Sequence, residues 1–132
     1  MTDSLITTAM GVQDNADALF ETLDLDNKIQ IICNTAIRKI SKEYPMKDGR
    51  YAIEKRQGKK YIKLICVEVM SDGERRHGSV WAFIDPATQG VYKPASWKAP
   101  AKHERYNLDN FQSFCDAARI ADWYGSWLYL RH

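Results

Sequence analysis

The chain is organised around residues 77–107, which read HGSVWAFIDPATQGVYKPASWKAPAKHERYN. Residues 80–85 form an alternating run of apolar and aromatic side chains, typical of a mostly buried strand. Residues 86–90, PATQG, favour a tight connection because proline fixes φ and glycine is free to take a positive φ. A second short run, residues 91–92, follows at hairpin distance. The pattern therefore predicts two antiparallel strands.

Residues 93–105, here called the basic loop, read KPASWKAPAKHER. The loop holds two prolines, one tryptophan and four Lys or Arg residues with a single acid. Proline removes backbone donors and stiffens the chain, which excludes a central strand or a helix interior. Cations pair with phosphate oxygens and an aromatic face stacks on a base. The composition therefore predicts a loop that holds an anion carrying a ring.

The candidate ligand-binding residues are aromatic, cationic and amide side chains of this region and of the chain's end. They are Trp81, Phe83, Lys93, Trp97, Lys98, Lys102, Arg105, Asn107 and Arg131. Other roles compete with ligand binding at several of these positions. Trp81 and Phe83 also suit a core, Trp97 a loop anchor, Lys102 a solvated surface and Asn107 a helix N-cap.

Three helices are predicted from apolar residues spaced three and four apart. They span residues 13–23, 28–44 and 108–121, with Asp26 or Asn27 as the cap of the second and Asn107 as the cap of the third. Pro45 ends the second helix.

Strands are predicted at residues 50–56, 60–70, 77–85 and 90–92, with a last strand at 126–131. Both faces of 60–70 are mainly apolar, which places that strand centrally. The resulting fold class is α+β: an antiparallel sheet of about four to five strands, with two N-terminal helices and one C-terminal helix packed mainly on one face. Residues 1–132 form a single domain, helical over 1–45, with the sheet, the C-terminal helix and the final strand over 46–132.

The composition, 45% apolar and 27% charged, is that of a soluble globular protein. No apolar run approaches the length of a membrane span, and no basic-then-apolar leader occurs, so we expect a cytoplasmic protein without a membrane partner. Cys33, Cys66 and Cys115 are far apart, without a CxxC pair or a histidine at ligand spacing. We therefore expect buried free thiols, no metal and no cofactor.

Charge is unevenly distributed along the chain, although the net charge is only +2. Residues 1–27 hold six acids and no Lys or Arg, whereas residues 28–60 hold ten bases and three acids. A protein that wraps long DNA carries a larger basic excess. The pattern fits a local basic pocket, or an acidic first helix that docks on a basic surface, including that of a neighbouring subunit.

The later part of the chain also resembles a known family. The string FIDPATQGVYKPASWKAPAK, then RYNL, then GSWLYLR at the end, is similar to a widespread family of small bacteriophage proteins, identified with the first-described Thoeris anti-defence sponges. The resemblance covers residues 80–131. It implies capture of cyclic ADP-ribose isomers made by a bacterial TIR-domain immune enzyme, and in some members of cyclic di- and trinucleotides. It further implies ligand sites between subunits of a homo-oligomer, either a dimer or a hexamer built as a trimer of dimers.

An enzyme is not expected, because the residues that catalysis needs are scattered. Cys66 and His77 are the one plausible nucleophile and base pair, and a thiol on a buried strand is normally inert. The glycines form no phosphate-binding loop. The leading hypothesis is a non-catalytic sponge in the cytoplasm of an infected bacterium. The alternatives are a single-stranded nucleic-acid-binding protein that uses the same loop, and a protein–protein inhibitor that uses the acidic N-terminal helix.

Overall fold

The computed structural model describes the backbone of residues 9–129 and the side chains of residues 16–129. Its elements follow the order helix, helix, five strands, helix and a short 3-10 turn. They are α1 (Ala9–Thr22), α2 (Leu25–Glu43), β1 (Gly49–Gln57), β2 (Ile62–Met70), β3 (Arg75–Asp85), β4 (Gly90–Tyr92), β5 (Tyr106–Asn107), α3 (Phe111–Ile120) and η2 (Ser126–Leu128).

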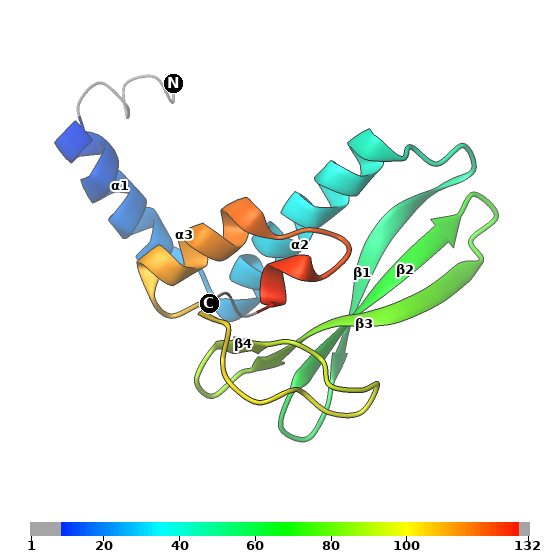
Figure 1. Ribbon diagram of the computed structural model, residues 1–132. Coiled ribbons are helices and arrows are strands. Elements are labelled where there is room, and N and C mark those ends of the chain that lie inside the picture. Colours follow the sequence, from blue (N-terminus) through cyan, green and yellow to red (C-terminus); the bar gives the residue numbers. More distant parts are fainter. Residues whose placement is uncertain (1–8, 130–132) are drawn as a thin grey trace.

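The five strands form one antiparallel sheet in the order β1-β2-β3-β4-β5. Helices α2 and α3 lie on one face of it, whereas α1 extends away from the body (Figure 1). The predicted α+β class, with an antiparallel sheet and its helices mainly on one face, is confirmed. The pairing of β4 with β5 was not predicted. Tyr106 and Asn107 directly follow the basic loop, and Asn107 was expected to cap the third helix.

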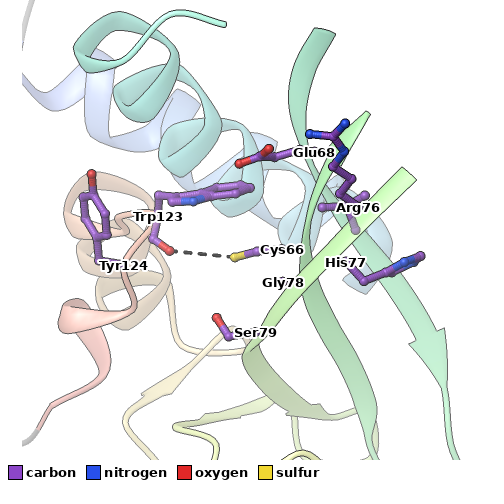
Figure 2. A pocket seen from close by; sticks show the side chains of 9 residues that line it. Cys66, Glu68, Arg76, His77, Gly78, Ser79, Trp123 and Tyr124 are labelled. Carbon is purple, nitrogen blue, oxygen red and sulfur yellow. Dashed lines mark hydrogen bonds between the residues drawn. The ribbon is translucent and has the colours of Figure 1, made fainter. Parts of the chain in front are cut away.

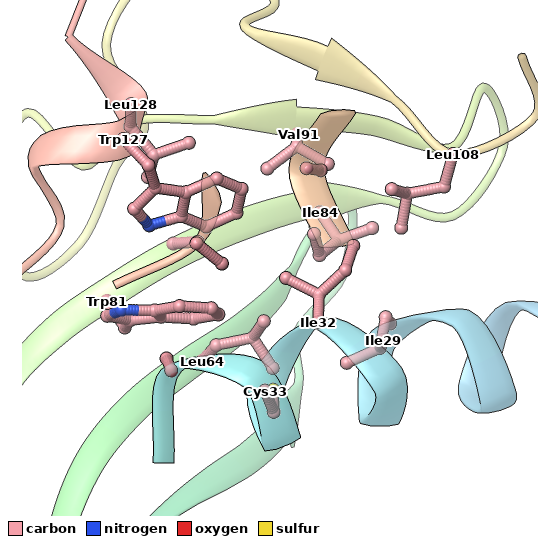
Figure 3. Close-up of a cluster of buried hydrophobic side chains, with 14 of the residues drawn as sticks. Ile29, Ile32, Cys33, Leu64, Trp81, Ile84, Val91, Leu108, Trp127 and Leu128 are labelled. Atoms are coloured by element: carbon pink, nitrogen blue, oxygen red, sulfur yellow. The ribbon is translucent and has the colours of Figure 1, made fainter. Parts of the chain in front are cut away.

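The core lies between the helices and the sheet (Figure 3). Ile29 and Ile32 of α2 face Leu64 and Ile84 of the sheet, and all four are at most 5% exposed. Trp81 packs against Trp127 of η2 with ring centroids 4.9 Å apart. Burying several such side chains contributes about 1.5–3 kcal/mol each relative to leaving them in water.

Helix α2 begins earlier than predicted. Its N-cap is Asp24, whose carboxylate accepts a hydrogen bond from the Asn27 backbone N–H at 2.8 Å, while the Asn27 side chain accepts from the Asp24 N–H. Residues 25–27, which lie before the predicted start, are therefore the first turn of α2. At the other end of the core, Lys39 of α2 donates to the carbonyls of Arg119 and Ala121 and so satisfies the last turn of α3.

The β3–β4 turn is also built differently from the sequence interpretation. Gln89, not Gly90, has the positive φ, at 65°. Gln89 is held there by a hydrogen bond from the buried Lys28 ammonium to its side-chain oxygen, at 3.2 Å. A Cβ at Gly90 would meet the Glu104 carboxylate and the edge of the Tyr92 ring, so a larger residue here would displace the Glu104 side chain.

The predicted final strand is wrong where the structure describes it. Gly125, at φ 83°, starts the 3-10 turn η2, and the Asp122 carboxylate accepts from the Ser126 backbone N–H. Trp127 and Leu128 are consecutive and both buried. A strand would send them to opposite faces, so the turn is what places both in the core. Residues 130 and 131 of the predicted strand lie outside the described residues.

Strand β3 contains two extra residues relative to β2: Trp81, and one of the two residues, Gly78 and Ser79, that lie opposite Cys66. Leu64 pairs with Ala82 but Ile65 pairs with Val80, so Trp81 is inserted between the two pairs as a bulge. Trp81 therefore turns towards the helices, together with Ala82 and Ile84. Phe83, which pairs with Lys63, lies on the opposite face, here called the outer face of the sheet.

Candidate functional site

The basic loop folds back on itself and presents Trp97 at its tip. Pro94 and Pro100 form an isolated antiparallel bridge, Ala101 N–H donates to the Lys93 carbonyl at 2.7 Å, and Ala95 N–H donates to the Ala99 carbonyl at 2.9 Å. The narrow hairpin leaves the Trp97 side chain 45% exposed.

Trp97 meets the outer face of the sheet through Lys63. The Lys63 ammonium lies 4.7 Å from the centre of the Trp97 ring and 5.9 Å from that of Phe83. Tyr61 contacts Phe83 and Tyr92 edge to face, with centroids 6.0 Å apart in both cases. Aromatic rings thus surround Lys63 at this end of the sheet, and the negative faces of the Trp97 and Phe83 rings stabilise its ammonium group.

Beside this cluster lies a cavity of about 340 Å³, here called the basic cavity. It is bordered by the β1–β2 turn, by β2 and β3, and by the basic loop. Its lining residues are Arg56, Gln57, Gly58, Lys59, Lys60, Tyr61, Lys63, Phe83 and Lys98. Five of them are cations and two are aromatic, and no carboxylate is among them.

One of these cations is already neutralised and four are not. Arg56 donates to the Glu54 carboxylate at 2.6 Å, as do Arg75 at 3.2 Å and His77 at 3.0 Å. These hydrogen bonds, that of Arg56 first, lower the pKa of Glu54 to about 2. No described carboxylate lies within ion-pair distance of the four lysines of the cavity.

Three of the residues predicted from the sequence meet at this place. Phe83 and Lys98 line the basic cavity, and Trp97 borders it through Lys63. Phe83 is only 2% exposed, so it forms part of the cavity floor rather than an open stacking face.

Three other predicted residues have structural roles instead. Trp81 is 2% exposed and donates to the Asp122 carbonyl at 2.8 Å. The Arg105 guanidinium donates to the carbonyls of Leu128, Lys102 and His103, tying the basic loop to η2. Asn107 donates to Thr88 and Glu104 and sits in β5, and the N-cap of α3 is Asn110, not Asn107. Ligand binding by the Trp81, Arg105 and Asn107 side chains is therefore not supported.

The remaining predicted residues lie apart from the basic cavity or outside the described part. Lys93 lies over the Tyr129 ring, 5.1 Å from its centre, on the helix side of β3. Lys102 is exposed on the basic loop, and Arg131 lies outside the described residues.

Sequence reasoning missed most of the cavity lysines because it treated residues 28–60 as a separate region. The ten bases there, set against only three acids, were the available signal. Lys63 was harder to find, because it stands inside an apolar strand. Only the alternation of Ile62, Lys63 and Leu64 indicates that it points away from the helices.

A second cavity, of about 390 Å³, lies on the helix side of the sheet (Figure 2). Cys66, Glu68, Arg76 and Ser79 line it, with Trp123 on its far side. The Cys66 thiol is directed to the Trp123 carbonyl, 3.8 Å away, and burial raises its pKa to about 12. The side chain of His77 points away from this thiol in Figure 2 and is bonded to Glu54 on the outer face. A thiolate–imidazole pair is not formed.

Neither a metal centre nor a membrane span is found in the described part of the chain. No group of three or more His, Cys, Asp or Glu side chains there is arranged to hold a metal ion. No helix among the described elements is long and apolar enough to cross a membrane.

The fold and the cavity together define a small α+β protein with a cationic cavity, partly lined by aromatic rings, on the outer face of its sheet. The chain belongs to a family of unknown function, DUF7717, whose profile matches residues 3–130. No match was found among curated proteins or among solved structures.

Proposed function

We propose that the protein binds a phosphate-bearing nucleotide in the basic cavity, reversibly and without cleaving it. The observation that carries this proposal is the convergence, beside the Trp97 ring, of four lysines that have no carboxylate partner among the described residues. Like charges held close together repel, and a bound anion removes that repulsion. The aromatic ring adds a stacking surface for a base.

The class of ligand is a cyclic nucleotide immune signal, such as a cyclic ADP-ribose isomer or a cyclic di- or trinucleotide. This part rests on the resemblance of residues 80–131 to phage anti-defence sponges. The protein then acts in the cytoplasm of an infected bacterium, where it lowers the free concentration of the signal. The same resemblance favours a homo-oligomer.

Non-catalytic capture is supported by the chemistry on both faces of the sheet. The cavity lysines provide charge but no carboxylate or imidazole that would act as a general base. The buried thiol of Cys66 stays protonated near neutral pH, because its pKa is about 12.

Calorimetric titration with cyclic ADP-ribose isomers, cyclic dinucleotides, cyclic trinucleotides and a short single-stranded DNA tests the proposal. We expect tight binding of one cyclic species, which is recovered unchanged after the protein is denatured. Recovery of a cleaved product would overturn the non-catalytic part. Binding that grows with oligonucleotide length and falls steeply with salt would instead assign the face to single-stranded nucleic acid.

Lysine variants locate the site. Lys63→Gln removes the cation between Trp97 and Phe83, and a lost charge-assisted hydrogen bond of about 1.5–3 kcal/mol weakens binding roughly tenfold to a hundredfold. Lys47→Gln is the matched control, because it removes one exposed charge from the loop before β1, at the opposite end of that strand. Equal effects of the two variants would show that only the overall charge matters.

A further inference from the structure

Arg56, the arginine that lines the basic cavity, is held by one of its nitrogen atoms. Its Nε–H donates to the Glu54 carboxylate at 2.6 Å, and its Nη groups have no hydrogen bond among the described residues. The two residues are two positions apart on β1, so their side chains lie on the same face of the sheet. A guanidinium has five N–H donors, and this arrangement leaves free the edge formed by Nη1 and Nη2. The Arg56 side chain is half exposed, so a ligand can reach that edge.

Glu54 is itself fixed by donors on its other side. Its Oε2 atom accepts from Arg56, whereas its Oε1 atom accepts from Arg75 Nη2 at 3.2 Å and from His77 Nε2 at 3.0 Å. Both carboxylate oxygens are therefore bonded, and the Glu54 side chain is only 22% exposed. Glu54 thus restricts the Arg56 guanidinium from a fixed position and is not a mobile surface acid.

Strand register places a second cation directly beside Arg56. Arg56 pairs with Lys63 of β2, and Lys63 pairs with Phe83 of β3, so the three side chains form a row across the outer face. Like charges directly opposite each other on neighbouring strands destabilise a sheet. Here Glu54 offsets one charge, and the rings of Trp97 and Phe83 stabilise the other. An anion bound between the two cations stabilises the row further.

We propose that Arg56 and Lys63 form a clamp for one phosphate group, and that Glu54 is the positioning residue of this clamp. The Nη edge of Arg56 donates two parallel N–H groups to two phosphate oxygens, and Lys63 adds a point charge from the neighbouring strand. The ligand therefore carries a phosphodiester or a pyrophosphate group, because each offers two free oxygens on one phosphorus. This inference rests on the proposed function, since it concerns the same cavity.

Replacement of Glu54 tests its role, because positioning and simple charge predict opposite signs. Glu54→Met and Glu54→Gln both remove one negative charge from beside the cavity, which by charge alone strengthens the binding of an anion. Glu54→Gln keeps an oxygen that accepts from Arg56 Nε, whereas Glu54→Met has none. We expect Glu54→Met to raise the dissociation constant about twofold to tenfold, because the released arginine must be ordered on binding. Glu54→Gln is expected to bind more tightly than Glu54→Met.

Inorganic pyrophosphate is the probe, because it has no base and so leaves stacking on Trp97 out of the measurement. Its binding is followed by NMR shifts of the backbone amides at about 0.15 M salt, where remote charges are screened. Glu74→Met is the matched control. Glu74 and Arg76 are also an acid and an arginine two positions apart, 3.4 Å from each other, and neither lines the basic cavity. The control is expected to leave the dissociation constant unchanged.

The sign of the Glu54→Met effect is expected to reverse when Arg56 is replaced by lysine. In Arg56→Lys the single ammonium group pairs with Glu54, and the second substitution releases it for the anion. An effect of the same sign in both backgrounds contradicts the positioning role.

Two further results overturn the inference. One is tighter pyrophosphate binding by both Glu54 variants than by the wild-type protein, or no binding by the wild-type protein at all. The other is rapid solvent exchange of the Arg56 Nε–H in the free wild-type protein, which needs no variant to fold and no ligand to bind. None of these results removes the proposed function. That function fails instead if pyrophosphate binds as expected but no cyclic nucleotide does.

Discussion

Replacing Trp97 by alanine separates ligand binding from packing at the tip of the basic loop. In the free protein the ring is 45% exposed and its charged contact is Lys63, 4.7 Å away. Losing an exposed cation–π contact costs about 0.5–1 kcal/mol of folding free energy. Losing a stacked base costs about 1–3 kcal/mol of binding free energy, which raises the dissociation constant about fivefold to a hundredfold.

The assay combines calorimetric titration of the bound nucleotide with urea unfolding of the same samples. Trp97→Phe keeps a ring and is expected to fall between wild type and alanine in affinity. Tyr44→Ala removes an exposed ring at the end of α2 and serves as the control. An unchanged affinity in Trp97→Ala, with the fold intact, would refute the stacking role. A loss of several kcal/mol in unfolding free energy would show instead that the ring anchors the loop.

Three further results are expected. Asp24→Ala removes the capping box of α2 and lowers the unfolding free energy by about 1 kcal/mol in urea titration; an unchanged midpoint would contradict the cap. The pKa of Glu54 is lowered from its ordinary value of 4.5 to about 2 in the folded state. The ionised Glu54 therefore stabilises the fold fully above pH 4.5, and this contribution is lost as the pH falls towards 2. Glu54→Gln should therefore be less stable than wild type at pH 7 and converge with it in acid, whereas a constant difference would argue against the ion pairs. The thiols of Cys33 and Cys66, with pKa values raised to about 12 chiefly by burial, should react with a thiol reagent only after unfolding; rapid labelling of the native protein would contradict this.

The main elements of the fold were predictable because their signals are local. The apolar residues of α2 recur every three or four positions, and those of β2 occupy both faces of a central strand. The structure at the end of the chain was not predictable, because Trp127 and Leu128 reach the core through a turn that starts at Gly125. A short run of apolar and polar residues does not distinguish such a turn from a strand.

The candidate site was only partly predictable, because it is assembled from three separate segments. The basic loop supplies Trp97 and Lys98, as expected from its composition, but Lys60 and Lys63 come from β2 and the turn before it. Which lysines converge depends on the strand register, and a single sequence does not reveal it. The structural role of Arg105 was missed for a related reason: its partners are carbonyl groups, which carry no sequence signature.

Because Trp81 is an inserted residue, the fold depends on the number of residues in β3 and not only on their hydrophobicity. A second inserted residue lies between His77 and Val80. Arg76, before both insertions, and Ala82 and Ile84, after them, therefore face the helices, whereas Val80 between the two insertions faces outward. A chain one residue shorter at this point would keep almost the same hydrophobicity. It would nevertheless bring either the residues before Trp81 or those after it to the wrong side of the sheet, exchanging Phe83 for Ile84 in the core or turning Arg76 outward. In this family a single-residue deletion in β3 should therefore be far less tolerated than any exposed substitution along the same strand.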